Sequence, residues 1–125
     1  MRRAIATGLP PETAPFSHAV VVGGWLYTAT LPVRSDGNLE TRSSAAQAET
    51  ALANLRQVVE AAGATLDDVA QVVVYLTRPE DKPAMDEAYA RVFRRPYPSR
   101  VCVVVTALAV PEARIEVQAC VALPA

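Results

Sequence analysis

Two charged residues interrupt apolar segments near the end of the sequence. Arg100 opens the run Arg-Val-Cys-Val-Val-Val, and Glu116 lies within Ile-Glu-Val-Gln-Ala-Cys-Val. The planar guanidinium of an arginine can bind a carboxylate through two parallel hydrogen bonds. A carboxylate among apolar residues needs a partner, and it can orient a water molecule for attack on an electrophilic carbon. The two residues therefore suit a site that binds a small carboxylate and activates water beside it.

Taken alone, this pattern favours a simpler interpretation. Arg100 and Glu116 would then form an ordinary ion pair at a contact between subunits. Cys102 lies two residues after Arg100 and so shares its face of the strand. A lone cysteine in such a strand is more typical of a small buried apolar residue than of a nucleophile. His18 is the only histidine, and we expect it at an edge or an interface.

The hydrophobic pattern predicts the elements that must position these residues. Apolar residues at three- and four-residue spacing predict helices over 43–62 and 79–93, and Gly63 is a natural terminator of the first helix. Strands are predicted over 18–22, 25–30, 69–77, 100–106 and 113–122, with a further strand at 3–7. Gly23-Gly24 is typical of a hairpin turn between the first two of these strands. The order predicts an α+β sheet with two helices in a single domain over residues 1–125.

The strands also predict a contact with a second copy of the chain. Residues 101–105 and 19–22 are apolar at every position, so both of their faces are apolar. Two helices can cover only one face of such a sheet. We therefore expect another copy of the chain to bury the other face.

The composition argues against several classes of function. The chain has 125 residues and a formal net charge of −1, which does not fit a basic surface for nucleic acid. No apolar run approaches the ~20 residues of a membrane span, and no secretory signal is evident, so we expect a cytoplasmic protein. Cys102 and Cys120 are then expected as free thiols. One histidine and no CxxC pair make a metal site a poor interpretation.

Several segments together resemble the RidA/YjgF family of reactive-intermediate deaminases, whose early members were labelled L-PSP endoribonucleases. These segments are Ala14–Val20, Leu55–Gly63, Pro98–Cys102 and Ile115–Ala119, and the resemblance runs from about Ile5 to the C-terminus. It implies a chorismate-mutase-like fold, with a mixed β-sheet and two helices on one face. It also implies a homotrimer with active sites in the clefts between subunits. The implied activity is hydrolysis of imines or enamines such as 2-iminopropanoate to a keto acid and ammonia, with no cofactor.

The resemblance also implies roles for individual residues. Arg100 matches the arginine that binds the substrate carboxylate, and Cys102 matches a cysteine that lines the pocket. Glu116 matches the glutamate that positions the attacking water. Phe16 stands where many members have tyrosine, and Asp86 where many have asparagine.

One segment departs from the family pattern. Thr28-Ala-Thr-Leu-Pro32 is one residue shorter than usual and lacks a glycine that lets backbone approach the substrate. Either Ala29 and Thr30 line the pocket in its place or the pocket differs, which puts the substrate, more than the chemistry, in question. A deaminase of the 2-aminomuconate type is one alternative, and a regulatory protein that binds a small carboxylate without turnover is another. A ribonuclease is the weakest hypothesis, since the chain is slightly acidic and lacks a histidine pair.

Overall fold

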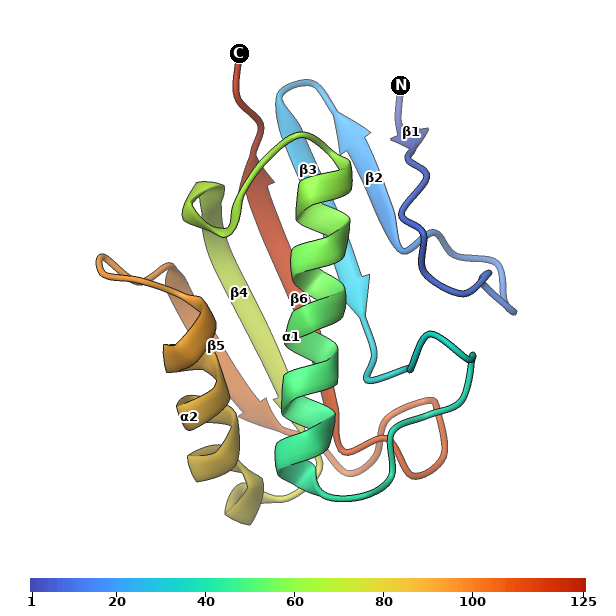
Figure 1. The fold of residues 1–125 in the computed structure, drawn as a ribbon, viewed down its shortest axis with the longest axis vertical. Helices are drawn as coiled ribbons and strands as arrows, with labels where there is room; N and C mark the ends of the chain where they lie inside the picture. The colour runs from blue at the N-terminus through green and yellow to red at the C-terminus, as the bar shows by residue number, and fades with distance from the viewer.

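The computed structural model describes residues 1–125 as one six-stranded sheet with two α-helices (Figure 1). Short 3₁₀ helices at Leu66–Asp68 and Pro79–Asp81 precede β4 and α2. The elements in chain order are β1 Arg3–Ala4, β2 Ala19–Val22, β3 Trp25–Thr30, α1 Ser44–Ala61, β4 Val69–Leu76, α2 Lys82–Val92, β5 Ser99–Val104 and β6 Ile115–Ala122. The α+β class and the mixed sheet with two helices are confirmed.

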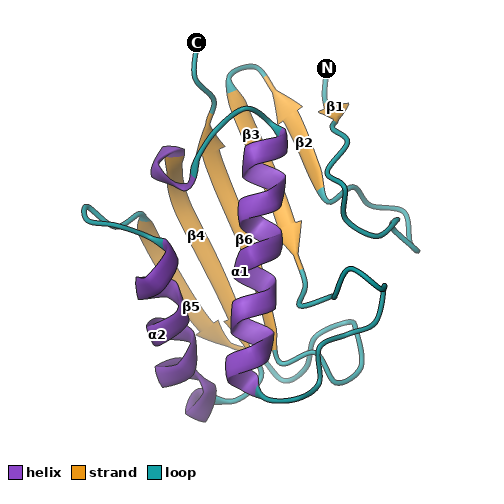
Figure 2. Ribbon diagram, in the orientation of Figure 1, coloured by secondary structure: helices purple, strands orange, loops and turns teal.

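The last strand of the chain lies in the middle of the sheet. The strand order is β1-β2-β3-β6-β4-β5, in which β4 and β5 are parallel and every other pair is antiparallel. The helix α1 connects β3 to β4, and β6 is inserted between these two strands (Figure 2). This insertion places Glu116 near the centre of the sheet and leaves β5, with Arg100, at its edge.

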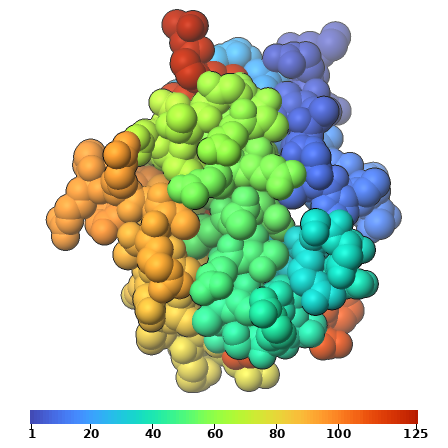
Figure 3. Space-filling view, viewed as in Figure 1, coloured from blue at the N-terminus to red at the C-terminus, as the bar shows by residue number.

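Both helices cover the same face of the sheet, which we call the helix face (Figure 3). Alternate residues of β6 are buried on that side because successive side chains of a strand point to opposite faces. They pack against the apolar stripe of α1, and together they form the centre of the core. The buried residues of β6 are Ile115, Val117, Ala119 and Val121. Neither helix is long and apolar enough to cross a membrane.

The other face of the sheet, which we call the open face, carries no helix. Large apolar side chains lie exposed on it, and Trp25, Tyr27 and Val101 are each more than two-fifths exposed. The expectation that the strands are apolar on both faces is therefore confirmed. An exposed apolar surface of this kind is typical of a contact with another protein chain.

The ends of several elements differ from the sequence-based expectation. The first strand is short, because only Arg3 and Ala4 pair with β2, opposite Val21 and Val20. The last strand begins at Ile115 because Glu112 has a φ of +69° and Ala113 donates to the carbonyl of Val110 in a turn. The beginning of the second predicted helix is a 3₁₀ turn rather than α-helix.

The N-terminus of α1 gives a direct test of the local structure. The hydroxyl of Ser43 accepts a hydrogen bond of 3.0 Å from the backbone N–H of Ala46, which the helix itself cannot satisfy. We expect Ser43→Ala to lower the free energy of unfolding by about 1 kcal/mol. Urea unfolding of both variants measures this, with the neighbouring Ser44→Ala as the matched control. Equal losses in the two variants would contradict the assignment of the cap.

Candidate active site

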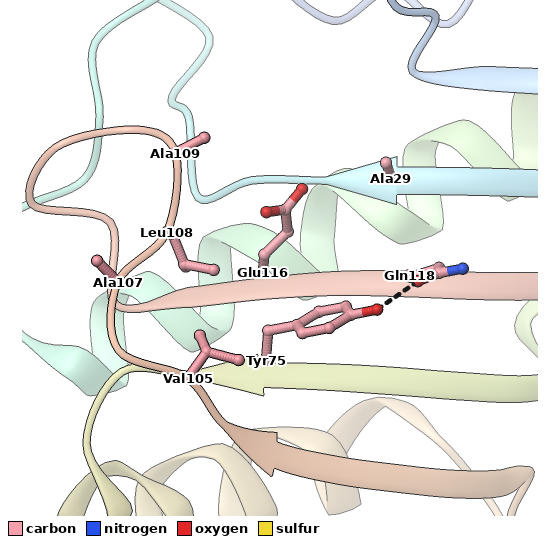
Figure 4. A pocket seen from close by; sticks show the side chains of 8 residues that line it. All are labelled: Ala29, Tyr75, Val105, Ala107, Leu108, Ala109, Glu116 and Gln118. Carbon is pink, nitrogen blue, oxygen red and sulfur yellow. Dashed lines mark hydrogen bonds between the residues drawn. The ribbon is translucent and has the colours of Figure 1, made fainter.

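Glu116 lies in a pocket on the open face of the sheet. The strand β6 places its side chain between β3 and β4, and the loop 105–114 that precedes the strand lies beside it (Figure 4). The pocket has a volume of about 400 Å³, and six of its eight lining residues are hydrophobic. Its lining residues are Ala29, Tyr75, Val105, Ala107, Leu108, Ala109, Glu116 and Gln118.

The carboxyl of Glu116 has no cationic partner. None of the lining residues is basic, and Glu116 forms no ion pair in the subunit. Burial without a compensating charge raises the pKa of Glu116 above its usual range. A carboxyl with a raised pKa is a better proton acceptor than an ordinary one, so this group is suited to general base catalysis.

A hydrogen-bonded pair forms one side of this pocket. The hydroxyl of Tyr75 donates to the side-chain oxygen of Gln118 over 2.8 Å (Figure 4). The bond directs the amide nitrogen of Gln118, which is exposed, away from Tyr75 and toward the solvent side. The pocket therefore combines one ionisable group, one polar pair and an apolar loop.

Arg100 lies on β5 and faces the helices. Its guanidinium approaches Asp86 of α2, with 2.7 Å between Nη2 and Oδ1, and it stacks over the ring of Tyr89 at 4.8 Å from the ring centre. The other oxygen of Asp86 accepts a hydrogen bond of 2.7 Å from Lys82. Burial opposes ionisation of Asp86, but the contacts with Lys82 and Arg100 outweigh it and lower the pKa of this carboxyl. Burial also raises the pKa of Tyr89 to about 12, partly offset by the charge of Arg100.

Arg100 and Glu116 lie on opposite faces of the sheet. Arg100 is paired with Val72 of β4, which is buried under the helices, whereas Glu116 is paired with Tyr75 on the open face. The two side chains therefore do not meet within one subunit. The ionic partner of Arg100 in the subunit is Asp86 rather than Glu116.

The structure separates the other predicted site residues as well. Cys102 shares the helix face with Arg100, packs against the core and is a free thiol, as is Cys120 on the opposite face. Ala29 lines the pocket of Glu116. Thr30 does not, because its side chain is 1% exposed on the helix face and its hydroxyl donates to the carbonyl of Val117.

The segment that contains Phe16 lies outside the pocket of a single subunit. The Phe16 ring is 45% exposed and meets the His18 ring edge to face at 5.5 Å. The carbonyl of His18 accepts a hydrogen bond from the backbone N–H of Ala29, so this segment ends beside the pocket. The imidazole of His18 is held by the carbonyl of Pro10 at 2.9 Å.

A buried polar network, which the sequence did not reveal, holds the loop that lies beside Glu116. The carboxylate of Asp81 is 2% exposed and accepts two hydrogen bonds from Arg114, of 3.1 and 2.7 Å. Gln47 of α1 is also buried, donates to the carbonyl of Glu112 and accepts from the backbone N–H of Arg114. The Asp81–Arg114 pair and the hydrogen bonds of Gln47 both hold the backbone or side chains of residues 112–114, directly before β6. Tyr75 was missed too, although its place in the alternation of β4 puts it on the face opposite Val74.

Comparison with known proteins assigns the family. Residues 7–123 match the model of the family described as Endoribonuclease L-PSP. The chain is 32% identical to the 2-iminobutanoate/2-iminopropanoate deaminase of Dermatophagoides farinae, over 98% of this chain and 97% of that protein. It is 33% identical to the RutC family protein y4sK of Sinorhizobium fredii, over 91% of each chain. The chain belongs to the Endoribonuclease L-PSP family, which is the RidA/YjgF family.

Solved structures agree with this assignment. RidA from an Antarctic Psychrobacter species superposes with a TM-score of 0.90 at 29% identity, over 97% of this chain and 99% of that one. TdcF of E. coli, crystallised with bound serine, gives a TM-score of 0.88 at 26% identity, over 98% and 99% of the two chains. The RidA-type fold inferred from the sequence is therefore confirmed.

The raised pKa of Glu116 predicts how its replacement affects stability. Because the pKa is higher in the folded state than in the unfolded state, the ionised carboxyl lowers stability above that pKa. The loss disappears when the pH falls below the ordinary glutamate pKa of about 4.3, where both states are protonated. We expect Glu116→Gln to raise the free energy of unfolding at pH 7, with the gain shrinking toward pH 4.

Urea unfolding at a series of pH values measures this gain. The matched control is Glu60→Gln, the same chemical change at an exposed position of α1. If Glu116→Gln were less stable than the parent at pH 7, the carboxylate would have a stabilising partner that the structure lacks.

Proposed function

We propose that the protein is a hydrolytic deaminase that converts imines or enamines of 2-keto acids into the keto acid and ammonia. The observation that carries the proposal is the unpartnered carboxyl of Glu116 in an otherwise apolar pocket. The name of the relative from Dermatophagoides farinae supports the substrate class, which is that of 2-iminobutanoate and 2-iminopropanoate. The activity of this chain would then need neither a cofactor nor a metal.

The proposed reaction adds water across the C=N bond. Glu116 accepts a proton from water as the oxygen attacks the imine carbon, and the protonated carboxyl returns a proton to the nitrogen. Loss of ammonia from the tetrahedral intermediate then leaves the C=O bond of the keto acid. Imines hydrolyse in water unaided, so positioning the two reactants and supplying one base is sufficient catalysis.

In this proposal Arg100 binds the carboxylate of the substrate and thereby places the imine carbon. Cys102 and Asp86 lie beside Arg100 on the helix side, and Ala29 contributes to the wall around Glu116. Because Arg100 and Glu116 lie on opposite faces of one sheet, the complete site requires two copies of the chain. Arg100 lies on the edge strand β5, where it can reach the open face of a neighbouring subunit.

The assembly that we propose is a homotrimer with the open faces packed together. Burial of Trp25, Tyr27 and Val101 would drive this association, since these side chains are exposed in the single subunit. Phe16 would then lie near the mouth of the pocket, on the segment that ends beside Ala29. The free thiols of Cys102 and Cys120 suit the reducing environment of the cytoplasm, where we place the enzyme.

A second candidate function is binding of a small carboxylate without turnover. The observation that favours it is the serine bound to TdcF, a protein of the same fold. A binding protein needs the Arg100 side of the site alone and would gain nothing from the destabilising carboxyl of Glu116.

Hydrolysis of the imine is measured by competition with semicarbazide, which traps imines as they form. An amino-acid oxidase or a dehydratase generates the imine, and an active deaminase lowers the yield of trapped product. We expect Glu116→Gln to lower kcat roughly a hundredfold, the usual contribution of a general base. We expect Arg100→Ala to act mainly on KM, because it removes a contact made in both the ground state and the transition state.

The variant Glu60→Gln, with the same chemical change far from the pocket, should match the parent protein. Unchanged trapping by the parent protein across several amino acids would refute the deaminase. Carboxylate binding without turnover would then select the second candidate. Turnover of 2-aminomuconate but not of 2-iminopropanoate would instead identify a ring-cleavage deaminase.

A further inference from the structure

Three charged side chains form a chain of contacts at the edge of the sheet. Lys82 donates to Asp86 over 2.7 Å, and Asp86 lies 2.7 Å from Arg100. Lys82 and Asp86 are one helical turn apart on α2, and Arg100 faces them from β5. The group holds two positive charges and one negative charge, so its net charge is +1.

Because the net charge of this group is +1, one carboxylate of a bound substrate neutralises it and a second does not. A single carboxylate at Arg100 neutralises the group, whereas a second negative charge would have no cation to meet. The Glu116 pocket offers none, because its lining residues include no lysine, arginine or histidine. A second carboxylate placed there would instead face the carboxyl of Glu116, and repulsion between like charges opposes binding.

Asp86 is not the only group that holds the Arg100 side chain. The guanidinium also stacks over the ring of Tyr89, which is 5% exposed and packs against Phe93 at 4.3 Å between ring centres. The negative charge of Asp86 therefore has a separable effect, which is to reduce the attraction of Arg100 for anions. Replacement by asparagine removes the charge and retains an oxygen that can accept from the guanidinium.

We propose that Asp86 is a specificity-determining residue that restricts the Arg100 site to substrates with a single carboxylate and an apolar remainder. The inference rests on the proposed function, because it takes Arg100 as the group that binds the substrate carboxylate. It goes further in giving Asp86 an opposing role, which excludes substrates with a second carboxylate, rather than an attractive one.

Direct binding of two stable keto acids to the full-length protein tests the inference by calorimetry. The probes are 2-oxobutanoate, with one carboxylate, and 2-oxoglutarate, with two. We expect Asp86→Asn to tighten binding of 2-oxobutanoate about threefold, the effect of one charge some ~6 Å away in water. Binding of 2-oxoglutarate should tighten by a larger factor, since the repulsion from Asp86 is relieved for both of its charges. The difference in affinity between 2-oxobutanoate and 2-oxoglutarate should therefore be smaller in Asp86→Asn than in the parent protein.

The matched control is Glu87→Gln, which makes the same charge change one residue along α2, where Glu87 contacts Arg91 instead. This control should leave both affinities unchanged, and Asp86→Glu, which keeps the charge, should resemble the parent protein. Weaker or unchanged binding of both probes by Asp86→Asn would overturn the inference, and so would an equal gain in affinity for the two probes. So would an equal gain in Glu87→Gln, which would mean that only the overall charge matters.

Imine trapping on the same variants separates this inference from the proposed function. If the parent protein hydrolyses imines but Asp86→Asn gains no affinity, the deaminase stands and the role of Asp86 is refuted. If no imine is hydrolysed but Asp86→Asn tightens binding of 2-oxoglutarate more than that of 2-oxobutanoate, the charge filter stands and the deaminase is refuted. Arg100→Ala should abolish binding of both probes in either case, and its failure to do so refutes the role of Arg100 on which this inference rests.

Discussion

The alternation of side chains along β6 is the constraint on which the rest of the structure depends. Every second residue of this central strand is buried beneath α1, so the residues between them must point to the face without helices. Glu116 is one of these, and it lies in a pocket on a face that is otherwise apolar. The same alternation on β5 sends Arg100 to the helix face. One geometric rule therefore gives each subunit a carboxyl on one face and a guanidinium on the other.

The two charged residues are stabilised very differently. Arg100 has an anionic partner and an aromatic ring, whereas Glu116 has neither. An uncompensated, half-buried carboxyl lowers the stability of the fold at neutral pH, and carboxyls whose pKa is raised by burial are concentrated at functional sites. The network of Asp81, Arg114 and Gln47 rigidly supports the loop beside it. Stability is thus supplied on the helix side, whereas the open side keeps an uncompensated carboxyl.

Local patterns predicted much of this arrangement. The spacing of apolar residues gave the course of α1, and alternation placed Glu116 with Gln118 on one face. Contacts between distant segments could not be predicted in this way. The pairing of Arg100 with Asp86 depends on the crossover through α2, and the burial of Thr30 depends on the register of β3 against β6. The loop that lies beside Glu116 has no periodic pattern, so its contribution to the pocket was not evident from the sequence.

The central claim is that a working site takes Arg100 from one subunit and Glu116 from another. Complementation between two inactive variants tests it most directly. Arg100→Ala and Glu116→Gln are unfolded together in equal amounts, refolded so that their subunits mix, and assayed by imine trapping. With random mixing, about one quarter of the shared sites combine an intact Arg100 with an intact Glu116, so about one quarter of the parent activity should return. Activity no greater than the sum of the two separate variants would contradict the shared site.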